Sequence, residues 1–424
     1  MVIDNSALNQ LADQQNELSA KVAAMTPPFK KTAQGGIKTT SVVNVQLGIE
    51  FDPLLRNALA YNQFTWEVEV LRDIPELHIK KGQMLDMYSA IITGELEHLW
   101  DAVFSAQALS NGIMTTAQKA AYNPVQDYLR HAAEVWDKKE RLKTFMNTFL
   151  GVAITPVNEL IIKIWLVGAC MKAFEPDAKF DYVLDLVGGQ GAGKTTLLER
   201  LGAGWYTDQF QNFTDKDYYS TMLRAWIVND DEMAATANST FEELKKFISA
   251  RKLEFRPAYG HTAIRRDKGF VMARTTNETT YLKDKTGERR FLPLLADLEQ
   301  QKQHPVTDLT PDIVQQIWGE AMNLYRSGYS TELTHDQEMQ LSLHRDQFTY
   351  VDAVEEEIES VLAKWSSDFI TSGEIAKNIG AGDLVKNPRV AKKIKYIMDN
   401  RKDWKAGQRR IMKVPQRGWK RVKV

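Results

Sequence analysis

The sequence predicts an α/β protein whose core is a parallel β-sheet, with a mostly helical region before it and a winged helix-turn-helix after it. A glycine-rich loop joins a β-prone run to a helical segment within residues 182–200. Two later apolar runs, at 225–228 and 270–273, end in polar residues, and residues 386–424 are strongly basic. Strands separated by helical segments favour a parallel sheet with helices on both faces.

Length and composition indicate several packed domains. The 424 residues are 43% hydrophobic, which is ample for ordinary cores, and length alone suggests two or three domains. We expect a helical N-terminal region over 1–150 that serves oligomerisation, a core over 151–335 and a helical linker with a DNA-binding domain over 336–424.

Charge is distributed unevenly along the chain. The totals nearly cancel, with 54 basic and 55 acidic side chains, yet residues 386–424 carry a net charge of +13 and the preceding residues −14. A basic segment on an acidic body predicts a polyanionic partner. The single cysteine, Cys170, offers neither an internal disulfide nor a zinc cluster and favours a reducing cytoplasm.

The first 150 residues show mainly helical periodicity. We expect a helix near 8–22, strands near 43–47 and 64–68, and helices within 84–100 and 116–149. The apolar run 160–174 contains Lys163 and Lys172 and is shorter than the roughly 20 apolar residues that span a bilayer. It predicts a buried helix, with no membrane segment.

The glycine-rich loop fits the phosphate-binding pattern G-x-x-x-x-G-K-[ST] at every fixed position and in the required strand-loop-helix context. Glycines allow successive backbone N–H groups to close around phosphates. Lys194 would neutralise the β- and γ-phosphates of ATP, and the Thr195 hydroxyl would bind Mg²⁺. The predicted nucleotide-binding residues are Gly188, Gly189, Gln190, Gly191, Ala192, Gly193, Lys194, Thr195 and Thr196.

A nucleotide-hydrolysing site of this kind also needs a carboxylate for the metal and a base for the attacking water. Asp230, Asp231 and Glu232 follow the second strand. We expect Asp230 or Asp231 to hold the metal and Glu232, with Asp231, to act in catalysis; the sequence does not separate the two aspartates.

Three residues beyond the third strand complete the predicted site. Asn277 could hydrogen-bond the γ-phosphate or the water, although a lone Asn more often forms a turn. Arg289 and Arg290 follow a charged loop, and a guanidinium delivered from a neighbouring subunit would stabilise charge on the transferring phosphoryl group.

These residues resemble the virulence-associated protein E family of bacteriophages and pathogenicity islands, which is related to superfamily 3 helicases of the AAA+ group. The likeness runs from about Asp127 to Pro293. It rests on Tyr128-Leu129, Trp136-Asp137, Arg141, the loop Gly188 to Thr195, Leu244 to Phe247, Phe255 to Pro257, Tyr259-Gly260, Thr275 to Asn277, Thr286-Gly287 and Arg289 to Phe291. The resemblance implies a ring ATPase that acts on DNA during replication of a mobile element.

The chain departs from the family at one position. Asn229 stands where the family usually has a glutamate at the strand tip, with Asp230 and Asp231 after it. Either the register slips by one residue or the metal ligand has moved.

Two basic regions are the predicted DNA contacts. Similar helicases project a hairpin from the interval between the second and third strands, where phosphate contacts give affinity without sequence choice. In the tail, a capping box at Thr371 and Glu374, a helix opening at Asn387-Pro388 and a basic hairpin with Trp404 and Trp419 interleaved predict the winged helix. The candidate DNA-binding residues are Lys252, Arg256, His261, Arg265, Arg266, Arg389, Lys392, Lys393, Arg409, Arg410 and Arg417.

We therefore expect an ATP-driven replicative DNA helicase of a phage or mobile element, acting as a ring-shaped homo-oligomer, a hexamer. It would use ATP and Mg²⁺, bind single- and double-stranded DNA in the bacterial cytoplasm, and meet host or phage replication proteins. The alternative is an ATP-switched DNA-binding adaptor or helicase loader that does not unwind.

Overall fold

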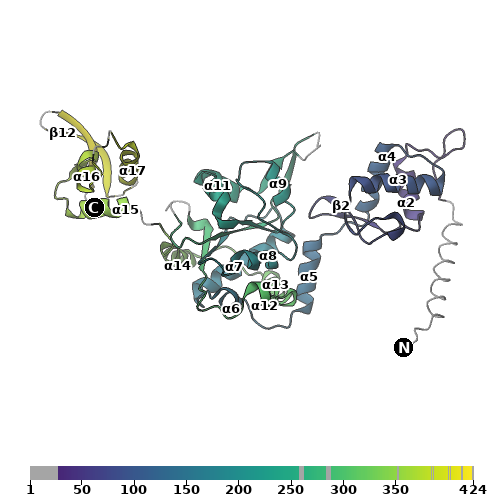
Figure 1. The fold of residues 1–424 in the computed structure, drawn as a ribbon, viewed down its shortest axis with the longest axis horizontal. Helices are drawn as coiled ribbons and strands as arrows, with labels where there is room; N and C mark the ends of the chain where they lie inside the picture. The colour runs from purple at the N-terminus through teal and green to yellow at the C-terminus, as the bar shows by residue number, and fades with distance from the viewer. Residues whose placement is uncertain are drawn as a thin grey trace. The chain divides into compact units, whose positions relative to one another are not determined.

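The computed structural model describes residues 27–256, 262–282, 288–350, 353–382, 384, 386–399, 401, 403–411 and 414–422 (Figure 1). The helix expected near 8–22, the candidate DNA contact His261 and the motif residues Pro257, Tyr259, Gly260, Thr286 and Gly287 lie outside these ranges. The chain forms two compact units, Met1–Thr276 with Leu294–Leu333, and Asn277–Pro293 with Thr334–Val424. The predicted limits of three domains stay predictions.

The N-terminal part of the first unit packs helices against a small antiparallel sheet of order β1-β2-β3. Its elements are α2 (Val42–Phe51), β1 (Leu59–Asn62), β2 (Glu67–Val70), η1 (Pro75–Leu77), β3 (Gly82–Gln83), α3 (Asp86–Trp100) and α4 (Ala106–Gln118).

The strand expected near 43–47 is wrong, because this segment lies in helix α2. The alternation misleads because the polar residue Asn44 is itself buried. Its side chain accepts from Lys30 N at 2.8 Å and donates to Lys30 O at 2.8 Å and to Lys38 O at 3.1 Å. The side chains of Asn44 and Val45 are therefore both buried. Successive side chains of a helix can both be buried, whereas those of a half-buried strand alternate between the interior and the solvent.

The centre of the first unit is a five-stranded sheet of order β10-β4-β9-β6-β5, whose pairs β4/β9, β9/β6 and β6/β5 are parallel. Every residue of β4, β6 and β9 is buried, which requires cover on both faces. The predicted parallel sheet is thus confirmed. Its strands and the segments between them are β4 (Val183–Val187), α8 (Lys194–Leu201), β5 (Tyr206–Thr207), α9 (Asp217–Met222), β6 (Ile227–Asp230), η2 (Asp231–Met233), α10 (Ala234–Ala237), α11 (Phe241–Ser249), β7 (Lys252–Phe255), β8 (Ile264–Asp267), β9 (Val271–Thr276) and β10 (Phe291–Leu295).

Helices that precede β4 in the chain and helices that follow β10 pack together next to this sheet (Figure 1). They are α5 (Pro124–Val135), α6 (Phe145–Leu150), α7 (Pro156–Phe174), α12 (Pro305–Asp308) and α13 (Pro311–Arg326). The apolar run 160–174 is the buried helix that was expected: Trp165 Nε1 donates to Met272 O of β9 at 2.9 Å. No helix in the described part of the chain combines the length and apolarity needed to cross a bilayer.

The second unit contains η3 (Glu288–Arg290), α14 (His335–Asp346), α15 (Ala353–Lys364), β11 (Phe369–Thr371), α16 (Ser372–Asn378), α17 (Pro388–Asp399), β12 (Trp404–Ile411) and β13 (Val414–Arg421). Its sheet has the order β11-β13-β12. The predicted capping box at Thr371 and Glu374 is present, and Ile394, Ile397 and Met398 are the buried residues of α17.

Trp404 and Trp419, which are interleaved with the basic residues of the tail, take no part in its surface. Both side chains are buried in the core of the second unit, and Trp419 Nε1 donates to Asp399 Oδ1 at 2.7 Å. Because neither ring is exposed, the two tryptophans cannot serve as stacking platforms for nucleic acid in this structure. Their spacing in the basic tail reflects the core of a small domain.

Gly319→Ala should destabilise the protein because α13 approaches α5 closely at this position. An added Cβ would lie 2.5 Å from Ala132 O and 2.7 Å from Trp136 Cβ. We expect a loss of about 1–3 kcal/mol in the free energy of unfolding, measured in urea. Gly94→Ala in α3, where a Cβ would meet nothing within 4 Å, is the control and should be neutral or stabilising by up to about 1 kcal/mol. Equal behaviour of the two variants would contradict the close packing.

Candidate functional site

The glycine-rich loop lies between β4 and α8 and needs its glycines for two reasons. Gly188, Gly191 and Gly193 have φ angles of 142°, 87° and 82°, which residues with a Cβ rarely adopt. A Cβ on Gly188 would also lie 2.6 Å from Ala296 O, and one on Gly193 2.9 Å from Pro305 Cδ. The predicted residues Gly188 to Gly193 form this loop, and Lys194, Thr195 and Thr196 open α8.

A segment following β10 supports the loop from outside. Gln301 Nε2 donates to Ala192 O at 3.1 Å, and His304 Nε2 lies 3.0 Å from Gly191 O. These contacts engage carbonyl oxygens of the loop. Carbonyls that are bound on the outside leave the backbone N–H groups of a loop free to face a ligand.

Lys194 is held within the loop that precedes it. Its Nζ donates to Gly188 O at 2.6 Å and to Gly189 O at 3.0 Å, and only 7% of the residue is exposed. Burial lowers the pKa of Lys194, and the nearby Asp231 and Glu232 oppose this shift.

Asp231 joins the loop to two neighbouring strands. Its Oδ1 accepts from Thr195 Oγ1 at 2.6 Å, from Thr275 Oγ1 at 2.8 Å and from Asn229 Nδ2 at 3.2 Å. The carboxylate therefore lies beside the Lys-Thr pair of the glycine-rich loop, at the edge where the parallel strands end. Of the two aspartates predicted for a metal, this one is in the appropriate place.

Asp230 has a different role in this structure. Its carboxylate accepts from Ala235 N at 2.8 Å, from Thr236 N at 3.0 Å and from Thr236 Oγ1 at 2.5 Å. Burial raises its pKa, whereas these hydrogen bonds and the charge of Arg274 lower it. Asp230 therefore organises the turn after β6, and the geometry favours Asp231 as the metal ligand.

Arg274 on β9 continues this arrangement across the sheet. In the strand register it stands opposite Asp230 of β6 and Asp185 of β4. Its guanidinium makes a two-point ion pair with Asp185, at 2.8 and 2.6 Å, and both residues are buried. Such a bidentate pair fixes the side chains across neighbouring strands.

The turn between Asp231 and α10 is strained. Glu232 and Met233 both have φ angles of 52°, in the left-handed region that non-glycine residues rarely adopt. Thr275 Oγ1 accepts from Glu232 N at 2.8 Å, and the bonds to Asp230 close the turn from the other side. Strain of this kind is concentrated at functional sites.

The oxygen donors here suit a hard divalent cation. Thr195 and Asp231 offer a hydroxyl and a carboxylate, and the buried Asn229 Oδ1 has no hydrogen-bond partner. Mg²⁺ binds few protein oxygens and keeps several waters, so a lone carboxylate with a hydroxyl fits it. No cluster of three or more His, Cys, Asp or Glu that could hold a metal occurs in the described ranges.

Asn277, Arg289 and Arg290 belong to the second unit. Asn277 and Arg289 are exposed, and Arg290 is half-buried, with both arginines in η3. Their predicted action on a phosphate, including delivery from a neighbouring subunit, stays a prediction.

The hairpin β7-β8 carries the first group of predicted DNA contacts. Lys252 is exposed and pairs with Asp267 at 3.1 Å, and Arg256 and Arg265 are exposed. Arg266 is different: it is 8% exposed, donates to Phe64 O and lies over the Trp66 ring. This burial removes Arg266 from the surface that could meet DNA.

The second group lies on α17, β12 and β13. Arg389 and Lys392 are exposed on α17 and Lys393 is half-buried, on one helix face at spacings of three and four. The strand residues Arg410 and Arg417 are exposed, and Arg409 is half-buried and pairs with Asp368 at 2.8 Å. These six side chains lie on α17 and on the strands β12 and β13, and their contact with DNA stays a prediction.

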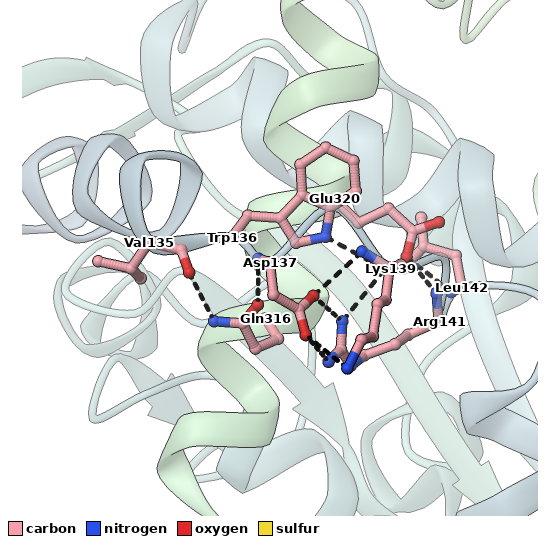
Figure 2. Close-up of polar contacts among 8 residues, drawn as sticks. All are labelled: Val135, Trp136, Asp137, Lys139, Arg141, Leu142, Gln316 and Glu320. Carbon is pink, nitrogen blue, oxygen red and sulfur yellow. Dashed lines mark hydrogen bonds and ion pairs between the residues drawn. The ribbon is translucent and has the colours of Figure 1, made fainter.

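The segment before the core is anchored to α13 (Figure 2). Gln316 accepts from Asp137 N at 2.8 Å and donates to Val135 O at 2.9 Å. Glu320 accepts from Arg141 N and from Leu142 N, the latter at 3.0 Å. Two side chains of α13 therefore fix the end of α5 and the loop that follows it.

Within that loop, Asp137 is the centre of an ion-pair cluster (Figure 2). Its carboxylate accepts from Arg141 NH1 at 2.6 Å and NH2 at 2.7 Å, and its pKa is lowered chiefly by these hydrogen bonds. Trp136 Nε1 donates to Lys139 O at 3.2 Å. The motif Trp136-Asp137 with Arg141 thus has a structural explanation.

Two residues of the site were not predicted to take part. Thr275 binds both Asp231 and Glu232 N, and Tyr206 OH accepts from Asn229 Nδ2 at 2.9 Å. For Thr275, its position at the end of the third strand indicated that it lies near the site, although not which groups it contacts. The sequence holds no comparable signal for Tyr206.

The chain belongs to the virulence-associated protein E-like family. The model of the virulence-associated protein E-like domain matches residues 129–350, more than half of the sequence. This match confirms the family that the sequence motifs indicated, and it contains the glycine-rich loop, the acids after β6 and the arginines of η3.

Among solved structures, three of the NrS-1 C-terminal region are matched. An A form apo structure of residues 305–718 has a TM-score of 0.44 at 11% identity and covers 86% of this chain and 96% of that one. A second A form apo structure has a TM-score of 0.41 at 12% identity, covering 87% and 97%. A further apo structure has a TM-score of 0.39 at 12% identity, covering 88% and 99%. No curated protein matches the sequence.

Asp230→Ala should destabilise the fold, because it leaves the N–H groups of Ala235 and Thr236 and the Thr236 hydroxyl without their acceptor. We expect a loss of about 1–3 kcal/mol in the free energy of unfolding, measured in urea. The exposed Asp177 provides the control, since Asp177→Ala should change stability by less than about 0.5 kcal/mol. A fully stable Asp230→Ala variant would show that the turn does not depend on this carboxylate.

Proposed function

We propose that the protein is an ATP-driven replicative DNA helicase of a phage or mobile element, acting as a ring-shaped homo-oligomer, a hexamer, in the bacterial cytoplasm. The observation that carries the ATPase part is the contact of Asp231 with Thr195 next to the glycine-rich loop and Lys194. A strand, this loop and a helix in succession form the phosphate-binding loop of P-loop ATPases. The family membership supports the same reading.

In this proposal each residue has a defined task. The backbone N–H groups of the loop bind the phosphates, and Lys194 neutralises the charge that develops on the β- and γ-phosphates. Thr195 and Asp231 would hold Mg²⁺, which when bound neutralises phosphate oxygens. Glu232 would orient and deprotonate the attacking water; its charge acts on Lys194, whose pKa it raises, which supports a position near the loop.

The DNA-binding part rests on the second unit. Its order of helix, strand, two helices and a two-stranded hairpin, with the sheet β11-β13-β12, supports the proposed winged helix. The helix α17 presents Arg389, Lys392 and Lys393, and the hairpin adds Arg409, Arg410 and Arg417. Arg289 or Arg290 would reach the nucleotide of a neighbouring subunit.

An ATP-switched adaptor or helicase loader would use the same residues and is the second candidate. The two functions differ in strand displacement, since only a motor with contacts to the translocating strand unwinds a fork. Arg256 and Arg265 near the end of the β7-β8 hairpin are the residues proposed for that strand, and they favour the helicase.

Lys194→Ala and Asp231→Asn should each abolish ATP hydrolysis, because the phosphates lose their counter-charge in the first variant and the metal loses its carboxylate in the second. Turnover and fork unwinding, with and without single-stranded DNA, measure the effect. Lys179→Ala, which alters an exposed lysine paired with Asp181, is the matched control and should retain wild-type turnover. Wild-type turnover in Lys194→Ala would place hydrolysis elsewhere, whereas ATPase without unwinding in the wild type would favour the adaptor.

Arg389→Ala and Lys392→Ala should each weaken duplex binding in a way that depends on salt. Each neutralised phosphate contributes about −0.9 to the slope of log affinity against log salt, so each variant should flatten that slope by about one. Basal ATPase should stay unchanged. Lys377→Ala on the neighbouring helix α16 is the charge-matched control. Identical slopes in all four proteins would indicate that α17 does not touch the DNA backbone.

A further inference from the structure

A pocket of about 770 Å³ lies along α8, next to the glycine-rich loop. Thr196, Glu199 and Arg200 line it from one face of this helix, at spacings of three and four residues, and Ala203 lines it from the turn after the helix. Thr196 directly follows Thr195, so the pocket begins where the loop ends. A ligand whose phosphates lie in the loop has this pocket beside it for the rest of the molecule.

Helices α5 and α13 also line the pocket. Tyr128 projects from α5, and Asp312 and Gln315 from the first turns of α13. The two helices are locked together by Gln316 and Glu320, the side chains that bind the segment after α5 (Figure 2). The walls of the pocket are therefore held in place by the same contacts that explain the Trp136-Asp137 motif.

The lining combines aromatic rings with hydrogen-bonding groups. Tyr128 and Tyr206 offer aromatic surface, and burial raises the pKa of Tyr128 to about 12, so its hydroxyl stays neutral. Glu199 and Asp312 are carboxylates that accept from hydroxyl groups. Gln315 offers an amide, which can donate and accept at once.

These features match a nucleoside. Aromatic rings stack on bases, an amide pairs with the N6 and N7 atoms of adenine, and carboxylates accept from the two ribose hydroxyls. A few polar groups in a concave, partly apolar site are typical of small-molecule pockets.

Tyr206 connects this pocket to the acids. Its hydroxyl accepts from Asn229 Nδ2, which also donates to Asp231 Oδ1. A base resting against the Tyr206 ring would lie two side chains away from the carboxylate that contacts Thr195.

We propose that this pocket binds the adenine base and ribose of the nucleotide whose phosphates lie in the glycine-rich loop. The proposal rests on the proposed nucleotide-binding function. It assigns stacking to Tyr128 and Tyr206, the ribose hydroxyls to Glu199 and Asp312, and the choice of adenine over guanine to Gln315.

Calorimetry on the full-length protein with Mg²⁺ tests the proposal, using ATP, GTP and inorganic tripolyphosphate as probes. The wild type should bind ATP at least about tenfold more tightly than tripolyphosphate, since stacking on a base contributes roughly this much. Tyr128→Leu and Gln315→Trp should remove that advantage and leave tripolyphosphate binding unchanged. Tyr128→Phe, which keeps the ring, should bind ATP as the wild type does, and Gln315→Ala should lose only the preference for ATP over GTP.

Lys194→Ala separates the pocket from the phosphate site, because it should weaken ATP and tripolyphosphate alike. If Lys194→Ala weakens both while Tyr128→Leu and Gln315→Trp bind ATP normally, the phosphate site stands and the pocket proposal is overturned. A wild type that binds GTP more tightly than ATP overturns the assignment of adenine. Binding of neither nucleotide nor tripolyphosphate to the wild type overturns the nucleotide function and the pocket together. Thermal unfolding reports whether each variant is folded. If only one of Tyr128→Leu and Gln315→Trp folds, that variant is sufficient to test the proposal.

Discussion

The candidate site depends on the position of β9 between β4 and β6. In parallel strands the carboxyl ends lie at one edge, so the glycine-rich loop after β4 and Asp231 after β6 come out on either side of Thr275. The hydroxyl of Thr275 then contacts both Asp231 and the backbone of Glu232. A different strand order would separate the loop from the acids, although every local motif stayed intact.

The two adjacent acids serve different purposes here because β6 ends between them: Asp230 is the last residue of the strand and Asp231 the first of η2. Asp230 turns toward the first residues of α10 and closes the turn, while Asp231 turns toward Thr195. The ion pair between Arg274 and Asp185 lies on the same face of the sheet as Asp230, because the three residues stand opposite one another in neighbouring strands. The point at which β6 ends thus separates the carboxylate that closes the turn from the carboxylate that contacts Thr195.

Local patterns in the sequence were sufficient for the glycine-rich loop, the parallel sheet, the buried helix α7 and the capping box of α16. Contacts that depend on strand order were not predictable, because the hydroxyls of Thr275 and Tyr206 meet their partners only after β5, β6 and β9 are paired. The strand expected near residue 45 failed because Asn44 is buried by hydrogen bonds to the backbone of residues 30 and 38. Trp404 and Trp419 have basic neighbours in the sequence, but their side chains are buried in a core, which the sequence pattern alone did not indicate.

The hydrogen bonds of Lys194 to two carbonyl oxygens of its own loop affect the energetics of any anion that binds there. A surface ammonium must shed its water when it meets a phosphate, and that dehydration opposes binding. The Lys194 ammonium is already withdrawn from solvent when the chain folds, and the carbonyls substitute for water. The cost of dehydration therefore reduces the stability of the fold and not the affinity for the anion. A ligand has only to compete with the two carbonyl groups for the Lys194 ammonium.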